Sequence, residues 1–204
     1  MKTYPTIPKD IRRDLTVYVF DKLDGSNIRC EWTRKSGFNK FGSRRVLINE
    51  QTRILGEAVT LLREKEKDFD SILRKNRIDK CTLFFEFFGE NSFAGNHTDE
   101  EHTVSLIDID VFKRGVLPPS DFIKMFDGKV ETAALIDHRK INLKFIESVQ
   151  NGILEGMTFE GVVCKARNPK KTLRPVMFKI KNYAWLNKLK TFCGDDAEMF
   201  KRLA

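Results

Sequence analysis

A single run of residues, 81–88, limits the folds that this chain can adopt. It reads Cys-Thr-Leu-Phe-Phe-Glu-Phe-Phe and is apolar at every position except Thr82 and Glu86. A short apolar run without alternation is typical of a β-strand that is covered on both faces. The chain is therefore expected to build a sheet with packing layers on both sides. Glu86 is the exception within the run, because a buried carboxylate is costly unless it is paired.

Further strands and helices are indicated on either side of this run. Strands are predicted at residues 15–20, 28–32, 41–47, 104–112, 158–166 and 176–180, the first two flanking the turn Asp24-Gly25-Ser26-Asn27. Helices are predicted from residue 50 after a cap at Asn49, over 120–125 after a cap at Ser120, and over 142–149 and 183–192. The charged run 63–68 is interpreted as a solvated helix end. Together these elements predict one α+β domain over residues 1–204, with antiparallel sheets flanked by helices.

Composition narrows the functional classes. The chain has 37 Lys and Arg against 29 Asp and Glu, a net charge of +8, which favours a polyanionic partner. Its four cysteines lie far apart, without the paired spacing of a zinc site or a dense disulfide framework, and indicate reduced thiols. No apolar stretch approaches the length of a membrane span, and the N-terminus lacks the apolar run of a signal peptide. We expect no membrane partner and a cytoplasmic location, in the host cytoplasm if the protein is viral.

Five short segments carry residues suited to phosphate chemistry. In chain order they are Lys22-Leu-Asp-Gly-Ser-Asn27, Phe41-Gly-Ser-Arg-Arg45, Phe88-Gly-Glu90, Glu160-Gly-Val-Val-Cys-Lys165 and Phe178-Lys-Ile-Lys-Asn182. An arginine beside a glycine turn can clamp a phosphate, and a carboxylate just past a strand can accept hydrogen bonds from a ribose. Each segment alone is a common turn or strand end, so their shared order and spacing make the set informative.

Lys22 is the candidate nucleophile of this set. It lies at a predicted strand end before a turn, from which an amine can project into a cleft. To attack a phosphate the amine must be neutral, so its pKa must fall through burial or neighbouring positive charge. Lys179 and Lys181 share one face of a predicted strand, where they would hold an anion between them and lower the pKa of Lys22. Glu160 and Lys165 bracket another apolar strand and are expected on opposite faces.

The ordered segments resemble the signature motifs of the covalent nucleotidyltransferase superfamily, which contains DNA ligases, RNA ligases and mRNA capping guanylyltransferases. The resemblance covers residues 22–182. The segment 22–27 and the segment 87–95, Phe-Phe-Gly-Glu-Asn-Ser-Phe-Ala-Gly, are most similar to nick-sealing RNA ligases of phage and kinetoplastid type. This resemblance implies an ATP-grasp-like ligase adenylation fold.

The resemblance also implies catalytic roles. Lys22 would take AMP from ATP as a phosphoramidate, with Asp24 of the same motif in the catalytic set. Lys179 and Lys181 would contact the α-phosphate and offset charge that develops in the transition state. Glu160 would support the catalytic metal and its water shell.

Nucleotide-binding roles follow in the same way. Arg44 and Glu90 would hold the ribose, with Arg44 also near the nucleic-acid phosphate and Arg45 as an alternative one register along. Backbone groups around Asp21 would read the adenine edge. Asn27, also counted with the nucleotide-binding residues, would join the later sealing steps.

The match departs from the superfamily at the adenine face and after the last segment. The residue that aligns with the stacking aromatic is Ile107, which loses part of the stacking energy, and Phe112 is the alternative. The 22 residues after Asn182 (204 minus 182) are too few for an oligonucleotide-binding barrel or a helical domain. We therefore expect a bare catalytic domain without a C-terminal OB-fold, to which a separate protein partner could add substrate binding. A basic surface or an ordinary solvated loop is expected at Arg167, Lys170, Lys171 and Arg174.

The sequence thus predicts an ATP-dependent RNA ligase that joins 5′-phosphate and 3′-hydroxyl ends through a lysyl-AMP intermediate. Its cofactors are expected to be ATP and Mg²⁺, with Mn²⁺ as a substitute, and its partner nicked or broken RNA. A minimal ATP-dependent DNA ligase and a catalytically silent nucleotide-binding or nucleic-acid-binding module are the alternatives.

Overall fold

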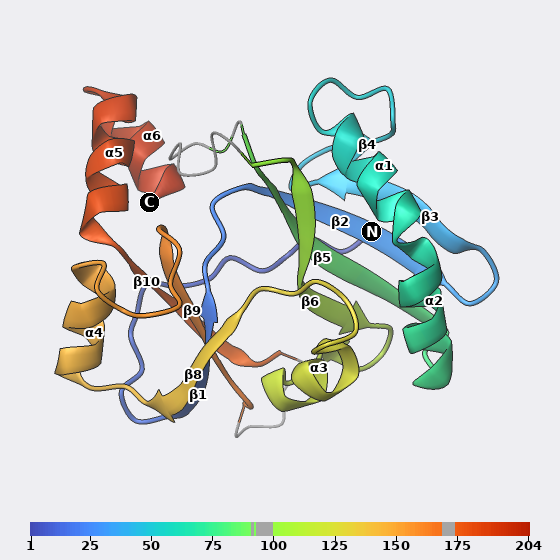
Figure 1. Ribbon diagram of the computed structural model, residues 1–204, viewed down its shortest axis with the longest axis horizontal. Helices are drawn as coiled ribbons and strands as arrows, with labels where there is room; N and C mark the ends of the chain where they lie inside the picture. Colours follow the sequence, from blue (N-terminus) through green and yellow to red (C-terminus); the bar gives the residue numbers. More distant parts are fainter. Residues whose placement is uncertain (91, 93–99, 169–173) are drawn as a thin grey trace.

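The computed structural model describes residues 1–90, 92, 100–168 and 174–204, and two antiparallel sheets form its centre (Figure 1). The smaller sheet has the strand order β10-β9-β1-β8, with β1 at Thr16–Asp21, β8 at Leu135–Lys140, β9 at Gly161–Ala166 and β10 at Val176–Lys181. The larger sheet has the order β4-β3-β2-β5-β6-β7, with β2 at Ser26–Thr33, β3 at Gly37–Ser43, β4 at Leu47–Ile48, β5 at Lys80–Phe88, β6 at Thr103–Val111 and β7 at Gly115–Val116. The predicted α+β class with antiparallel sheets is confirmed.

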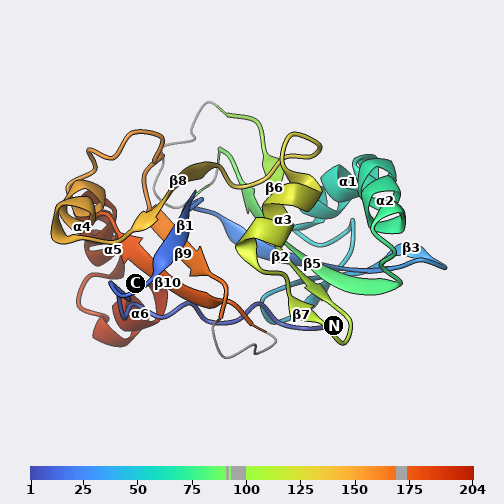
Figure 2. The same cartoon turned by 90° about the horizontal axis from the view of Figure 1, so that it is seen from below.

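Helices cover the outer faces of both sheets (Figures 1 and 2). The helices over the larger sheet are α1 at Gly56–Glu64, α2 at Glu66–Lys75 and α3 at Pro119–Phe126, and their apolar side chains share one core with β2, β3, β5 and β6. A second core joins the smaller sheet to α4 at Leu143–Gln150. A third, smaller cluster forms between α5 at Tyr183–Cys193 and α6 at Ala197–Leu203. Among the described residues no helix combines the length and apolar character needed to cross a membrane.

The central strand β5 divides its side chains between two environments. Leu83, Phe85 and Phe87 point into the core beneath the helices and are 0%, 0% and 5% exposed. Phe84 and Glu86 alternate with them and therefore face the other way, where Phe84 packs against the ring of Tyr4 at a centroid distance of 5.0 Å. The sequence interpretation of residues 81–88 as a strand covered on both faces is confirmed. Glu86 is tolerated in this apolar strand because its side chain lies on the second face, which borders a cavity.

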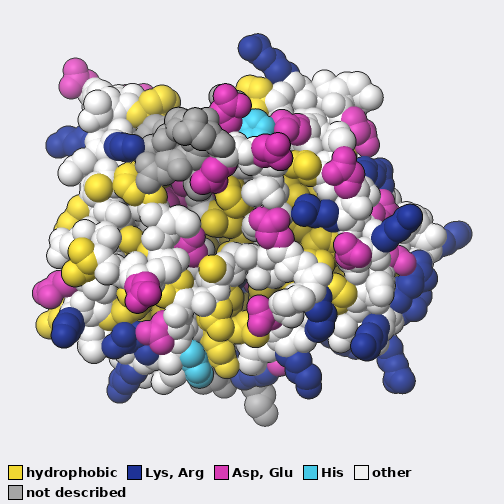
Figure 3. All heavy atoms as spheres, viewed as in Figure 1, with side chains coloured by type: hydrophobic (Ala, Val, Ile, Leu, Met, Phe, Trp, Pro, Cys, Tyr) yellow, Lys and Arg dark blue, Asp and Glu magenta, His cyan; other side chains and the backbone are white. Residues whose placement is uncertain are grey.

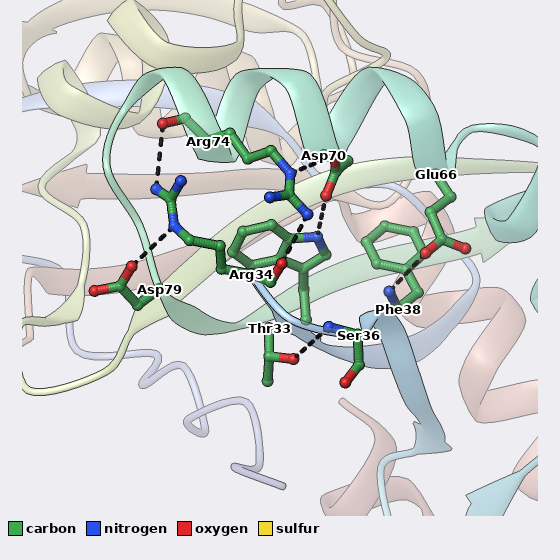
Figure 4. Close-up of polar contacts among 9 residues, drawn as sticks. Thr33, Arg34, Ser36, Phe38, Glu66, Asp70, Arg74 and Asp79 are labelled. Carbon is green, nitrogen blue, oxygen red and sulfur yellow. Dashed lines mark hydrogen bonds and ion pairs between the residues drawn. The ribbon is translucent and has the colours of Figure 1, made fainter.

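Helix α2 is fastened to the hairpin of β2 and β3 by polar contacts (Figure 4). Asp70 accepts a hydrogen bond from the indole Nε1 of the fully buried Trp32 at 3.2 Å and pairs with Arg74 at 2.6 Å. Arg74 in turn donates to the carbonyl of Arg34 at 2.7 Å. At the other end of the helix Glu66 accepts the backbone amide of Phe38 at 2.8 Å. These contacts fix the helix layer to the sheet.

The first predicted helix begins later and is followed by a second one. Asn49 caps a turn, with its Oδ1 accepting from the amide of Gln51 at 3.1 Å, and α1 starts only at Gly56. Ile54 has a φ of 65°, which interrupts any helix from residue 50. The charged run 63–68 does contain the end of α1, at Glu64, but α2 begins at Glu66 and continues to Lys75, so the run spans a junction of two helices. The predicted helix end is therefore confirmed, but the second helix was missed, although the buried Phe69 and Leu73 resume the apolar stripe beyond the run.

Three other boundaries differ from the predictions. Helix α3 begins at Pro119 after Pro118, without a side-chain cap, so Ser120 lies inside the helix rather than capping it. The predicted strand 41–47 is in fact the end of β3, a turn and the short β4. Strand β9 starts at Gly161 instead of residue 158, and β8 was not predicted. By contrast, α4 is capped by Asn142, whose Oδ1 accepts the Phe145 amide at 2.8 Å.

Candidate functional site

A cavity of about 470 Å³ opens between the two sheets. Its wall is formed by the segment 4–7, the turn after β1, parts of β2, β5, β6, β9 and β10, and the helices α5 and α6. Among the described residues, the cavity receives six cationic side chains, Lys22, Arg44, Lys165, Lys179, Lys181 and Arg202. Four carboxylates, Asp21, Asp24, Glu86 and Glu160, also line it, so the cations outnumber the acids by two (6 minus 4). This excess of positive charge favours an anionic ligand.

Lys22 is placed in the cavity by the end of β1. The Lys22 amide donates to the Gly161 carbonyl at 3.0 Å, which ties the turn to the start of β9. Next to it, the carboxylate of Asp21 accepts hydrogen bonds from the amide and hydroxyl of Thr158 at 3.0 and 2.9 Å. Gly25 completes the turn, and a Cβ at this position would lie 2.3 Å from the Phe87 carbonyl oxygen. Only glycine lets the turn pack this closely on β5.

Glu160 is the centre of a buried ion-pair network. Its Oε2 lies 2.7 Å from the Lys22 Nζ, and its Oε1 accepts a hydrogen bond from Lys181. The Glu160 side chain is 6% exposed, so both pairs form largely out of water. Burial raises the pKa of Glu160, but the positive charges of Lys22 and Lys181 outweigh it and leave the pKa lowered. Glu160 is therefore held as a carboxylate.

The prediction that the Lys22 pKa falls is wrong. Burial does lower the Lys22 pKa, but the carboxylates of Glu160, Glu86 and Asp24 together outweigh burial and leave the pKa raised. In the ligand-free protein Lys22 is a cation. A ligand that draws Glu160 away, or that brings positive charge, would be needed to free its lone pair.

The lowered pKa values belong instead to the two lysines of β10. Burial lowers the pKa of Lys181 to about 7 and that of Lys179 to about 8, and the positive charge of Lys22 contributes to both. Both side chains line the cavity, as their shared strand face predicted. The Nζ of Lys179 donates to the Ala204 carbonyl at 3.0 Å.

Glu160 and Lys165 both line the cavity, so the prediction that they point to opposite faces was wrong. Glu160 precedes β9, and Gly161 has a φ of 133°, so strand alternation does not extend to Glu160. Lys165 is 4% exposed and donates to Asp108 Oδ2 at 2.8 Å and to the Ile107 carbonyl at 2.7 Å. The hydroxyl of Tyr4 donates to the same Asp108 oxygen at 2.5 Å.

The nucleotide-binding candidates divide into those inside and outside this space. Ile107 lines the cavity, whereas Phe112 is 55% exposed at the end of β6 and lies outside the lining. Arg44 lines it and donates to the Thr6 hydroxyl at 3.3 Å, whereas Arg45 is exposed. Glu90 is exposed and, among the described residues, is not part of the lining.

The remaining candidates are also placed. Asn27 lines the cavity, and its Oδ1 is buried without a hydrogen-bond partner among the described residues. Asp24 is buried in the turn and lines the cavity. Arg167 pairs with Asp121 at 3.1 Å, and Lys170 and Lys171 lie outside the described residues.

Sequence reasoning left several cavity-lining residues out of the site, among them Glu86, Lys165, Tyr4 and Trp185. Glu86 lines the cavity and accepts a hydrogen bond from the Gly25 amide, and burial raises its pKa to about 7. The sequence signal that could have identified Glu86 was its position as a single acid within an apolar strand. Lys165 and Tyr4 also line the cavity. Tyr4 carried no signal, because it reaches the site only through the path of the N-terminal segment.

A divalent metal fits the chemistry of this site, although the described residues form no ready cluster of three His, Cys, Asp or Glu ligands. Asp24, Glu86 and Glu160 all line the cavity, and carboxylate oxygens suit Mg²⁺ and Mn²⁺. Both oxygens of Glu160 are engaged by lysines. A metal could thus use Glu160 only if one of these ion pairs opens, or through bound water.

The two antiparallel sheets with their flanking helices form an α+β fold that this chain shares with solved RNA ligase structures. Solved structures of Naegleria gruberi RNA ligase share it: a mutant with AMP and Mn aligns at a TM-score of 0.65 and 18% identity, over 85% of this chain and 51% of that chain. A mutant apo structure gives 0.66 and 19%, over 92% and 59%, and the ligase with PPi gives 0.64 and 19%, over 86% and 52%.

This chain therefore spans between 51% and 59% of the length of those ligase chains. No protein-family model matches the sequence, and comparison with curated proteins gives no match. At these identities the structural likeness establishes the fold.

Proposed function

We propose that the chain is the adenylyltransferase domain, over residues 1–204, of an ATP-dependent RNA ligase in which Lys22 becomes covalently bound to AMP. The observation that carries this proposal is the cluster of Lys22, Glu160 and Lys181 in a cavity where cationic side chains outnumber carboxylates. Glu160 holds Lys22 beside the buried Lys181. When a phosphate binds to Lys181, this arrangement is suited to release the Lys22 amine for attack.

The reaction is an in-line substitution at the α-phosphorus. Lys179 and Lys181 bind the α-phosphate, and their charge offsets the negative charge that develops on its oxygens. The phosphate competes with Glu160 for Lys181, so Glu160 becomes available for the metal and its water. Mg²⁺ or Mn²⁺, which Glu160 and the nearby carboxylates would hold, would supply positive charge to offset the negative charge of the leaving pyrophosphate. Lys22 then loses a proton and attacks.

The nucleotide is held along the cavity wall. Ile107 covers one face of the adenine, and Lys165 holds the Ile107 backbone by donating a hydrogen bond to its carbonyl. Backbone groups around Asp21 read the adenine edge. Arg44 holds the ribose together with Glu90, which is exposed and lies outside the cavity lining. Asn27, with its free Oδ1, acts in the later steps.

RNA with a 5′-phosphate and a 3′-hydroxyl is the proposed substrate, in a repair role. The support is the fold shared with a protein named an RNA ligase, whose structures contain AMP, ATP, PPi and Mn. On the face seen in Figure 3 acidic and apolar side chains occupy the centre, and Lys and Arg gather at the right and lower margins. The net charge of +8 favours RNA as a partner, and a partner protein could extend the RNA-binding surface. The four cysteines are free and buried, which supports a cytoplasmic location.

The decisive experiment is covalent labelling with ATP labelled at the α-phosphate. The wild-type protein should acquire label in the presence of Mg²⁺ or Mn²⁺, and GTP should not replace ATP. Lys22→Ala should acquire none, because the attacking nitrogen is missing. Lys40→Ala, at an exposed position of β3, is the matched control and should label normally. A labelled Lys22→Ala protein would exclude this assignment, and an unlabelled wild type would favour a silent binding module.

A second measurement separates RNA from DNA ligase activity. Nicked duplexes that differ only in RNA or DNA on the 3′-hydroxyl side should be sealed at different rates. We expect faster sealing with RNA at that position. Equal or faster sealing of the all-DNA nick would assign a minimal DNA ligase instead.

A further inference from the structure

Lys181 has a second partner besides Glu160. Its Nζ lies 3.6 Å from the ring centroid of Trp185, above the face of the indole. Trp185 is 4% exposed and lines the cavity from helix α5. The ammonium group of Lys181 is thus held between a carboxylate on one side and an aromatic face on the other.

The junction between β10 and α5 places Trp185 at this point. Asn182 ends β10 by donating its amide to the Glu160 carbonyl at 3.1 Å, and its Oδ1 caps α5 by accepting the Ala184 amide at 2.8 Å. The helix therefore starts at Tyr183, directly after Asn182, and Trp185 falls in its first turn. Leu189 and Cys193 follow on the same helix face and anchor it in the cluster with α6. The position of the indole is therefore set by the Asn182 cap at the start of α5 and by the apolar cluster with α6.

An aromatic face is an effective partner for a cation that has lost its water. The Lys181 side chain is 7% exposed, and burial lowers its pKa to about 7. The negative face of an indole attracts an ammonium group most strongly where solvent is excluded. Unlike a carboxylate, the indole does so without competing for the phosphate that Lys181 is proposed to bind. It remains in contact when Glu160 turns to other partners.

We propose that Trp185 is a positioning residue that holds the Lys181 ammonium group in place to bind the α-phosphate during transfer of AMP to Lys22. This proposal rests on the proposed function. In the step concerned, a bond forms between Lys22 Nζ and the α-phosphorus, and the bond from phosphorus to the pyrophosphate oxygen breaks. The pyrophosphate keeps the electron pair, and the Lys22 nitrogen releases two of its three protons to solvent and keeps the third in the phosphoramidate. Lys181 and Trp185 are unchanged at the end of the step.

The test is the single-turnover rate of lysyl-AMP formation, measured on the full chain at saturating ATP and Mg²⁺. Trp185→Leu keeps an apolar side chain but removes the aromatic face, and its rate should fall about tenfold, in line with a desolvated cation–π contact. Trp185→Phe restores a ring and should stay within about threefold of wild type. The Kd for ATP should change little in both variants, because Lys181 is proposed to act mainly on charge that develops during the reaction.

A matched control distinguishes positioning from general stability. Leu186→Ala removes apolar contacts from the same α5 cluster but lies outside the cavity lining, so it should lower the melting temperature and leave the rate unchanged. If the rates of all three variants simply follow their melting temperatures, or if Trp185→Leu reacts as fast as wild type, the proposal is wrong. Lys181→Ala provides the separate check: full activity of that variant would overturn the proposed role of Lys181 itself.

Discussion

Glu86 shows how one side chain can be costly for stability and useful in a site. It stands in a strand that is otherwise apolar, and its carboxylate faces the cavity with Lys22 and Asp24 nearby. Burial raises its pKa to about 7, the negative charges of Glu160 and Asp24 add to the rise, and the positive charge of Lys22 opposes it. The Gly25 amide is its hydrogen-bond donor. Glu86 thereby links the central strand to the turn that carries the nucleophile.

The raised pKa predicts the pH dependence of a Glu86→Gln variant. The carboxyl group binds its proton more tightly in the folded protein, with a pKa of about 7 against an ordinary 4.5. Its contribution to the free energy of unfolding is therefore complete below about pH 4.5 and is lost as the pH rises through about 7. At about pH 8 the variant should be more stable than wild type, by on the order of 1 to 3 kcal/mol, because no charge is buried.

Urea unfolding at several pH values measures this difference. Glutamine keeps an acceptor for the Gly25 amide, so the turn should be retained. The stability gain should shrink toward about pH 5, where Glu86 is protonated in the folded wild type. A gain that is constant over the whole range would mean that Glu86 is not the titrating group.

At the scale of helices and strands, local sequence predicted those elements whose apolar pattern and caps agree. Strand β5 and helix α4 with its Asn142 cap belong to this group. Helix α2 was not predicted because charged residues surround its few apolar positions, and its contacts to the hairpin come from residues distant in sequence. Strand β8, Leu135–Lys140, is largely exposed or half-buried and carries no apolar alternation. This segment forms a strand because it pairs with β1, and a pairing between distant segments cannot be read from the local sequence pattern.

The contacts of α2 predict the effect of Asp70→Ala. This change removes the acceptor of the buried Trp32 indole and the partner of Arg74 (Figure 4). A buried donor without an acceptor costs about 1 to 3 kcal/mol, so the free energy of unfolding should fall by that amount. Labelling with ATP should persist, since Asp70 lies outside the cavity lining.

Asp79→Ala is the matched control for the same network. It loses only a pair with Arg34 that is exposed on both sides, and should change stability little. Equal losses in the Asp70 and Asp79 variants, measured by thermal unfolding, would contradict a special role for the buried indole contact.

At the scale of the whole molecule, the site arises where the two sheets meet. The order of the motifs allowed Lys22, Glu160, Lys179 and Lys181 to be predicted as neighbours. The charge balance within the cluster could not be predicted, because it depends on which oxygens and amines face each other. For the same reason the lowered pKa that was predicted for Lys22 is found at Lys181 instead. The sheets themselves are joined by the pair of Lys165 from β9 and Asp108 from β6.

This buried pair predicts the response to Lys165→Met. The two side chains are 5% and 2% exposed and 2.8 Å apart, so the variant leaves Asp108 with the Tyr4 hydroxyl but without its cation. Loss of one partner of a buried pair costs about 3 to 5 kcal/mol. Replacing both partners, with Lys165→Met and Asp108→Leu, removes the uncompensated charge and should recover most of this loss. Urea unfolding of the two variants tests the prediction: if the double variant is less stable than Lys165→Met alone, the pair does more than neutralise charge between the sheets.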